Sequence, residues 1–306
     1  MKKFILCLVL LLMAGLVWWG ISTDETFSAK AQPRTAPSAK SFNKKLDVVV
    51  SGYAVYSLAR EIGGDKIQLT MLVAPGTEPH DFDPTPGSII AVDKSDLFLY
   101  VSNEIDPWVG DILRGLETVR SQAVGRVEKG ENPHLWMTPQ GATKMAQQIA
   151  QALTQADPKN AAYYAQRAET FEQSMQQLDQ DFKAGLSTCS SRYVLHIGHT
   201  AFAPLAQAYG LELEVLSGSA RQGEHSVYKL AELVQQIRQK KVSAIFTEEM
   251  LSQQLAQTLA GETSVAVLPL YTVEEVSKQD FDEGISYEIY MRLNLQHLQE
   301  GLVCLP

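Results

Sequence analysis

Three histidines lie in loops that directly follow apolar runs, a placement suited to metal binding. His80 lies in GTEPHDFDPTPGSI, His134 in ENPHLWMTP and His199 in HIGHTAFAPL. Prolines before and after His80 restrict the backbone, so its imidazole is presented by a stiff loop. Neutral imidazoles that converge suit Zn²⁺, which usually takes four ligands. Mn, Fe, Co, Ni and Cu also accept imidazole, so ligand type alone does not identify the ion.

A loop histidine of this kind, taken alone, is usually just a polar turn residue. The other three are weaker candidates. His196 lies two residues into the strand-to-loop junction of His199, where it could compete for the ion or be a hydrogen-bonded core histidine. His225 and His297 lie in helical surroundings without loop ligands nearby, and we interpret both as surface or structural residues.

The loops that carry the histidines connect predicted strands to predicted helices. Short apolar or β-branched runs predict strands, at 46–51, 66–73, 96–102, 192–197, 211–217, 242–248 and 264–270. Helical patterns alternate with them, at 52–64, 87–95, 106–116, 200–210, 227–241, 252–262 and 286–302. This alternation predicts an α/β fold with parallel sheets, whose ligands gather at the carboxyl ends of strands. The three histidines can therefore converge.

Residues 139–185 read as helix almost throughout, with a fresh start at Asp157-Pro158. The second helix has about 28 residues and would span roughly 42 Å, a length that suits a strut. We therefore predict two lobes, each a mostly parallel sheet flanked by helices, joined by one long rigid helix. The expected boundaries are 46–155 for the N-terminal lobe, 156–186 for the linking helix and 187–306 for the C-terminal lobe.

The N-terminus predicts export. Two lysines precede an apolar run from Phe4 to Ile21, and SAKA follows at 28–31, so residues 1–31 read as a signal peptide. An uncleaved signal anchor is the alternative. Residues 32–45 are a polar, flexible lead-in. We expect the protein in the periplasm or on the extracellular face of the membrane.

In an oxidising compartment the two cysteines beyond the leader, Cys189 and Cys304, predict a disulfide, with two free thiols as the alternative. The net charge is −9 without a basic block, which argues against a nucleic-acid partner.

Five motifs in this order resemble the metal-specific solute-binding proteins of ABC transporters, the ZnuA/TroA type. They are GTEPHDFDPTPGSI, NPHLWMTPQGA, HTAFAPLAQAYGL, AIFTEEMLSQQLAQTLA and SYEIYMRLNLQHL. The resemblance covers roughly 46–302. It implies that His80, His134 and His199, rather than His196, bind the metal. It also implies that the metal ion is captured between two lobes and delivered to an ABC transporter permease. We expect the protein to be a monomer.

The fourth ligand is where the sequence departs from this family. The usual slot for a carboxylate after the last strand holds Tyr271, with Glu274 and Glu275 nearby. Glu274 is our preferred ligand; Glu275, Glu78, Tyr271 or a water are the alternatives. His80 and His134 would belong to the N-terminal lobe, and His199 and the late carboxylate to the C-terminal lobe. Three histidines favour Zn²⁺ over Mn²⁺ or Fe²⁺, because a carboxylate commonly replaces the third histidine in manganese members.

Two other functions compete with transport. An exported zinc hydrolase would need an open metal position and a general base, but no H-E-x-x-H or similar paired motif occurs. We therefore expect no enzymatic activity. An adhesion module without a metal role is the second alternative. Glu248 and Glu249, in FTEE, are interpreted as structural residues that cap the following helix.

Overall fold

The computed structural model describes residues 44–116, 118–216, 227–248 and 253–305. The predicted signal peptide and nearly all of the lead-in lie outside these residues. No helix in the described part of the chain combines the length and apolar character needed to span a bilayer.

The first sheet has four parallel strands in the order β2-β1-β3-β4. They are β1 (Leu46–Val50), β2 (Ile67–Met71), β3 (Leu97–Tyr100) and β4 (Ser121–Ala123). The central β1 and β3 are buried along almost their whole length, as their continuous apolar sequences require when helices cover both faces. Strand β4 was not predicted, because its sequence SQA has only three residues and no apolar run.

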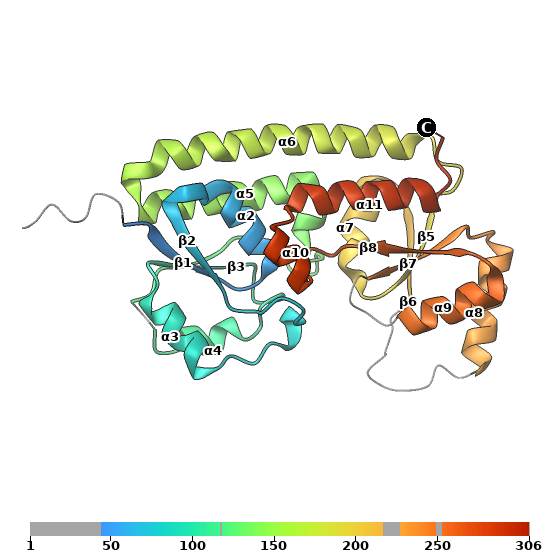
Figure 1. Cartoon of the computed structure of the whole chain (residues 1–306), viewed down its shortest axis with the longest axis horizontal. Helices are drawn as coiled ribbons and strands as arrows, with labels where there is room; N and C mark the ends of the chain where they lie inside the picture. Colours follow the sequence, from blue (N-terminus) through green and yellow to red (C-terminus); the bar gives the residue numbers. More distant parts are fainter. Residues whose placement is uncertain (1–43, 117, 217–226, 249–252, 306) are drawn as a thin grey trace, which may run out of the picture. The chain divides into compact units, whose positions relative to one another are not determined.

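The second sheet repeats this arrangement with four parallel strands in the order β6-β5-β7-β8. They are β5 (Tyr193–Ile197), β6 (Glu212–Leu216), β7 (Ala244–Glu248) and β8 (Ala266–Leu270). In each sheet the first strand pairs with the second and the third, and the fourth strand follows at the edge. The two parallel sheets, one in each lobe, confirm the predicted fold class (Figure 1).

Four helices accompany the first sheet. They are α2 (Tyr53–Gly63), α3 (Pro86–Lys94), α4 (Val109–Leu113) and α5 (Pro139–Ala156). Helix α3 begins with Pro86 and a reciprocal cap between Thr85 and Ser88, as the sequence pattern favours. The prediction of helix over 106–116 was too long: α4 ends before Arg114, which is extended, and Gly115, whose φ is +92°.

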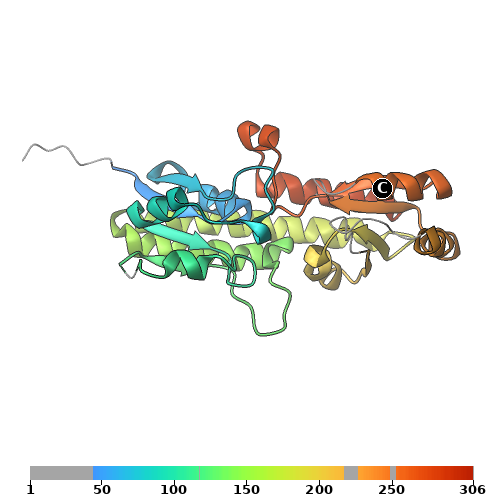
Figure 2. The same cartoon turned by 90° about the horizontal axis from the view of Figure 1, so that it is seen from below.

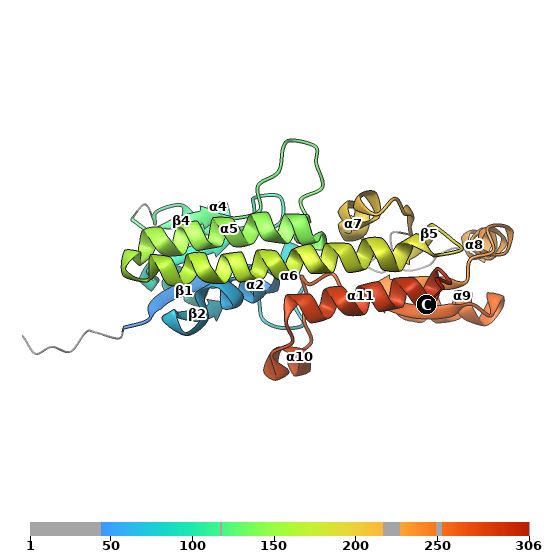
Figure 3. The same cartoon turned by 90° about the horizontal axis from the view of Figure 1, so that it is seen from above.

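The long helix α6 (Ala161–Ser187) has 27 residues and follows a 3₁₀ turn at Pro158–Asn160. It packs against α2 and α5 towards its N-terminus and against α11 towards its C-terminus, so it runs alongside both lobes (Figures 1 and 3). Its buried residues recur at spacings of three, four and seven, as Tyr164, Phe171, Met175, Leu178, Phe182 and Leu186.

The second sheet is accompanied by α7 (Ala203–Ala208), α8 (Val227–Gln239), α9 (Gln253–Thr263) and α11 (Tyr287–Gly301). A short helix, α10 (Lys278–Glu283), was not predicted; it protrudes in Figure 2. Ser277 caps its N-terminus, and Gly284 ends it with a φ of +70°. Cys189 and Cys304 form the predicted disulfide, which ties the end of α6 to the C-terminal tail.

Candidate metal site

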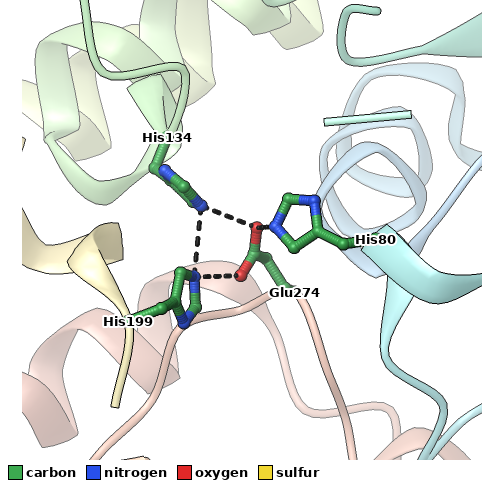
Figure 4. A group of neighbouring side chains, drawn as sticks. All are labelled: His80, His134, His199 and Glu274. Carbon is green, nitrogen blue, oxygen red and sulfur yellow. Dashed lines mark hydrogen bonds and ion pairs between the residues drawn. The ribbon is translucent and has the colours of Figure 1, made fainter. Parts of the chain in front are cut away.

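His80, His134, His199 and Glu274 lie together as one cluster between the two sheets (Figure 4). One candidate ligand atom from each residue lies within 4.8 Å of every other. Glu274 Oε1 is 3.1 Å from His134 Nε2, Glu274 Oε2 is 3.0 Å from His199 Nε2, and the two Nε2 atoms are 3.2 Å apart. His80 Nε2 lies 3.5 Å from Glu274 Oε1. Ligands about 2.0–2.1 Å from a tetrahedral Zn²⁺ are roughly 3.3 Å apart, so the distances among His134, His199 and Glu274 are close to those of such a site.

All four residues follow the carboxyl ends of strands. His80 follows β2, His134 follows β4, His199 follows β5 and Glu274 follows β8. The parallel sheets thus bring residues from distant parts of the sequence to facing edges, as predicted for the histidines. His134 and Glu274 are buried, whereas about a third of the His80 and His199 side chains is exposed.

The loop of His80 is fixed at several points. Pro79–Asp81 form a 3₁₀ turn, and the Glu78 side chain accepts a hydrogen bond from the His80 backbone N–H at 3.2 Å. Trp108 Nε1 donates to the Pro79 carbonyl at 3.2 Å. His80 Nδ1 lies 3.2 Å from the Ile105 carbonyl. Because a carbonyl can only accept, Nδ1 carries the proton in the neutral ring and Nε2 faces the cluster.

Asp106 fixes the backbone that holds His80. Its buried carboxyl group accepts hydrogen bonds from the Val101 N–H at 2.8 Å and from Ser51 Oγ at 3.1 Å. Burial raises the pKa of Asp106 to about 7, although these hydrogen bonds favour the ionised form. The loop that presents the Ile105 carbonyl is therefore anchored to the first sheet.

His134 precedes the 3₁₀ turn Leu135–Met137, which leads into α5. The Asn132 side chain accepts a hydrogen bond from the His134 N–H at 3.0 Å, and the same oxygen lies 2.7 Å from His134 Nδ1. Trp136 packs against the imidazole with ring centres 5.2 Å apart. The ring is thereby fixed with Nε2 directed into the cluster.

His199 is held by Glu248, at the end of β7. Glu248 Oε1 accepts from the His199 backbone N–H at 2.5 Å and lies 2.8 Å from His199 Nδ1. A side chain at Gly198 would collide with this carboxylate, so glycine allows the approach. Glu248 therefore has a structural role, as predicted, and the contact that the structure shows for its carboxylate is with His199; the start of the helix that it was expected to cap lies next to residues outside the described part of the chain. Glu249 lies outside the described residues.

The three histidines thus share one arrangement: Nδ1 faces a separate anchor and Nε2 faces the cluster. The anchors are a backbone carbonyl, an amide oxygen and a carboxylate. Anchoring of the second ring nitrogen is typical of metal-ligating histidine, because it fixes both the tautomer and the ring orientation. The Glu248 and Asn132 anchors escaped the sequence analysis. Only their proximity in the fold reveals them.

Glu274 enters the cluster from an unusual backbone conformation. Val273, immediately before it, is buried and has a φ of +59°, a conformation that costs a β-branched residue about 1–3 kcal/mol. Glu274 Oε1 is buried and has no well-directed hydrogen bond from the described residues. Its nearest neighbours are the Nε2 atoms of His134 at 3.1 Å and His80 at 3.5 Å, and a cation at the centre of the cluster would satisfy this oxygen together with both nitrogens.

The segment that carries Glu274, residues 271–286, is here called the strap. It leaves β8 but contacts the N-terminal lobe. Trp136 Nε1 donates to the Thr272 carbonyl at 2.8 Å, and Tyr53 Oη donates to the Ile285 carbonyl at 2.5 Å. The Gly76 N–H donates to the Val276 carbonyl at 2.9 Å. The strap is also tied to α11 beside the second sheet, through Asn294 at the Tyr271 backbone and Tyr290 at Asp280. The late carboxylate, which we expected in the C-terminal lobe, thus lies on a segment that contacts both lobes.

The electrostatics of the cluster favour an ionised Glu274 and a protonated His199 when no metal is bound. Burial alone would raise the pKa of Glu274, but the imidazoles of His134, His199 and His80 hold it well below its usual range. Burial lowers the pKa of His199, yet the carboxylates of Glu248 and Glu274 raise it overall to about 10. Glu274 also raises the pKa of His80. A divalent cation would replace these protons.

The other candidates for a ligand lie elsewhere. Tyr271 stacks on Tyr290 and His297, and its backbone is hydrogen-bonded to Asn294. Glu78 supports the His80 backbone. Burial and the neighbouring Glu78 raise the pKa of Glu275 to about 7, and Glu275 is not among the clustered residues.

The remaining histidines also lie away from the cluster. His196 is fully buried on β5 against Phe202, and burial lowers its pKa to about 3. Our alternative of a hydrogen-bonded core histidine was wrong in one respect, because neither ring nitrogen has a hydrogen-bond partner among the described residues. His297 Nδ1 lies 2.7 Å from the Pro269 carbonyl, a structural contact. His225 lies outside the described residues.

Known proteins resemble this chain over most of its length. The high-affinity zinc uptake system protein ZnuA of Bacillus subtilis is 29% identical over 292 residues, covering 88% of this chain and 91% of that protein. The zinc-binding lipoprotein AdcA of Streptococcus pneumoniae is 28% identical over 284 residues. That match covers 85% of this chain but only 56% of AdcA, so the chain spans about half the length of that relative.

The solved structures give the same result. The crystal structure of the Zn(II)-bound ZnuA-like domain of S. pneumoniae AdcA matches with a TM-score of 0.77 at 28% identity, covering 85% of this chain and 99% of the domain. A family model described as "Zinc-uptake complex component A periplasmic" matches residues 48–301. Since that match takes in both sheets, the long helix and all four clustered residues, the chain belongs to the ZnuA family.

Proposed function

We propose that the protein is the extracytoplasmic zinc receptor of an ABC importer, which binds Zn²⁺ through His80, His134, His199 and Glu274 and delivers it to a membrane permease. The observation that carries this proposal is the shared anchoring of the three imidazoles. Each ring is fixed through Nδ1, so that three Nε2 atoms and a buried carboxylate face one point. The zinc-binding relatives support the same ion.

The donor set also supports capture rather than catalysis. Three imidazoles and one carboxylate would complete a four-coordinate zinc shell, whereas a catalytic zinc keeps one position for water or substrate. A cargo ion held between two lobes can be released when the lobes separate. We propose that the protein acts as a monomer, exported by the N-terminal signal, whose ion is handed to the permease.

Equilibrium zinc binding tests this proposal. Wild-type protein should bind one Zn²⁺ in competition with a fluorescent chelator. The triple variant His80→Ala, His134→Ala, His199→Ala should lose at least 10³-fold in affinity, on the order expected when three of four ligands are removed. His297→Asn is the matched control, since it removes a histidine outside the cluster. Zinc binding by the triple variant at wild-type affinity would refute the site and favour an adhesion module.

Competition with other ions tests the identity of the cargo. Protein loaded from an equimolar mixture of Zn²⁺, Mn²⁺ and Fe²⁺ should retain zinc on elemental analysis, because imidazole-rich sites favour zinc over manganese and iron. Retention of manganese would assign the same transport role to another metal. Turnover of an ester or peptide by the zinc-loaded protein would instead favour a hydrolase.

A further inference from the structure

Asn132 makes contacts to both sides of the candidate site. Its Oδ1 accepts from the His134 N–H and faces His134 Nδ1, while its Nδ2 donates to the Thr200 carbonyl at 2.8 Å. Thr200 directly follows His199. A single side-chain amide therefore connects the backbone beside one candidate ligand to the imidazole of another, 65 residues away in the sequence.

The amide has only one orientation that satisfies its partners. The His134 backbone N–H can only donate, so it requires the amide oxygen; the Thr200 carbonyl can only accept, so it requires the amide nitrogen. With the oxygen placed, His134 Nδ1 must be the donor of the 2.7 Å contact. The link to Thr200 and the protonated Nδ1 of His134 are thus two consequences of one orientation.

The position of the strap explains why the hydrogen bond between Asn132 and Thr200 matters. Glu274 is tied to the lobe of His80 and His134, because the strap is hydrogen-bonded to Trp136 and Tyr53 in addition to its contacts with α11. His199 stands apart, since Glu248 on β7 fixes its ring and its backbone N–H to the second sheet. The Asn132–Thr200 hydrogen bond joins the three-ligand group to the segment that carries the fourth ligand.

We infer that Asn132 is a positioning residue that latches the His199 segment over the metal and thereby slows zinc release. This inference rests on the proposed function and goes beyond it, because it assigns control of the release rate to a residue that does not touch the ion. When the segment carrying His199 swings away, the Thr200 contact breaks. The Asn132 contact with His134 remains, so the other ligands stay in place.

Asn132→Asp separates the two roles of the side chain. Aspartate keeps an acceptor for the His134 N–H and Nδ1, but it places a carboxylate oxygen opposite the Thr200 carbonyl, where no hydrogen bond can form. The new carboxylate also adds a negative charge behind His134, which by itself would favour bound zinc, but it repels the Thr200 carbonyl. We therefore expect zinc dissociation into excess chelator to accelerate, though by less than the about tenfold that a loss of about 1.4 kcal/mol alone would give, with the association rate within twofold of wild type. The visible spectrum of the Co²⁺-loaded variant should stay four-coordinate.

Asn132→Ala removes both roles, so dissociation should accelerate by about 10–100-fold and the Co²⁺ spectrum should change as His134 loses its anchor. Asn103→Asp is the matched control: it makes the same chemical change at an exposed position of the N-terminal lobe, and it should leave both rates unchanged. Melting of the metal-free proteins checks folding, and Asn132→Asp decides the question even where the alanine variant is unstable.

The outcomes separate this inference from the proposed function. If wild type binds zinc, the triple histidine variant does not, and Asn132→Asp releases zinc at the wild-type rate, the latch is refuted while the receptor role stands. If wild type and the triple variant bind zinc equally, the site itself is wrong. An equal slowing of association and acceleration of dissociation in Asn132→Asp would also overturn the latch, because it would indicate a damaged site.

Discussion

Replacing Glu248 with glutamine tests how much the charge behind His199 contributes to zinc affinity. Glu248 Oε1 accepts from the His199 backbone N–H at 2.5 Å and lies 2.8 Å from Nδ1, and the residue is only 6% exposed. Glutamine keeps an oxygen acceptor of the same reach. The substitution therefore changes the charge of the anchor and leaves its shape nearly unchanged.

The size of the effect follows from the hydrogen bond to His199. A hydrogen bond to a charged group contributes about 1.5–3 kcal/mol, against about 0.5–1.5 kcal/mol for a neutral pair. The difference of about 1.2 kcal/mol corresponds to about an eightfold increase in the Kd for zinc. This increase applies to the Kd corrected for proton competition, because the same carboxylate also raises the pKa of His199. Loss of partners that orient metal ligands typically costs about 10–100-fold in affinity, and the value for a change of charge alone lies near the lower end of that range.

The assay is competition for Zn²⁺ between the variant and a fluorescent chelator at fixed pH and ionic strength. Glu262→Gln provides the control, because Glu262 is exposed on α9 in the same lobe and the substitution removes the same charge. Equal affinity for Glu248→Gln, Glu262→Gln and wild type would show that the carboxylate does not tune His199. Tighter zinc binding by Glu248→Gln would show that the carboxylate weakens zinc binding instead of strengthening it.

Three further predictions concern protons, the disulfide and the strap. Because the pKa of metal-free His199 is raised to about 10, zinc must displace its proton. The affinity for zinc should therefore rise at least tenfold per pH unit from 6.5 to about 10. Calorimetry of zinc binding in buffers of different ionisation enthalpy should show the release of this proton. The same shift makes the His199 contribution to metal-free stability complete below pH 6.5 and lost as pH rises through about 10. Replacing Cys189 and Cys304 with serine opens a link between residues 115 apart, which should cost about 2–4 kcal/mol in chemical unfolding while zinc affinity stays unchanged. Tyr53→Phe removes the hydrogen bond to the Ile285 carbonyl and should lower the unfolding free energy by about 1 kcal/mol; an unchanged value would show that this contact does not hold the strap.

Much of the fold could be predicted because its strands are buried on both faces. Runs such as LDVVV and AIFTE are nearly continuous in apolar residues, and such runs stand out against the helical patterns between them. The elements that escaped prediction lack this signal. Strand β4 has three residues at a sheet edge, and α10 is a short polar helix defined by its caps. Neither leaves an apolar period in the sequence.

Some residues of the site could be predicted from the sequence and others could not. His80 and His199 follow predicted strands, so the rule that ligands gather at the carboxyl ends of parallel strands applies to both. The strand before His134, β4, was not predicted, and the resemblance of NPHLW to the family motif indicated that residue. The strap could not be foreseen, because its contacts with Trp136 and Tyr53 bridge residues more than 130 positions apart. The role of Glu248 was hidden for the same reason: sequence places it beside a helix, whereas the fold places it beside His199.

The charges around the site explain how one divalent metal ion can replace bound protons without leaving uncompensated charge in the protein interior. Glu274 and Glu248 bring two negative charges to a largely buried cluster. Without metal, the pKa of His199, raised to about 10, keeps a proton and its positive charge there, and Glu274 raises the pKa of His80 as well. Zn²⁺ brings two positive charges and requires neutral imidazoles, so the bound cluster of ion, two carboxylates and three imidazoles is neutral as a whole. Uncompensated charge in such a place is costly, and Glu248 is needed for the balance although it does not face the ion. A monovalent cation would leave the bound cluster one charge short, so the same carboxylate that orients His199 also favours a divalent cargo.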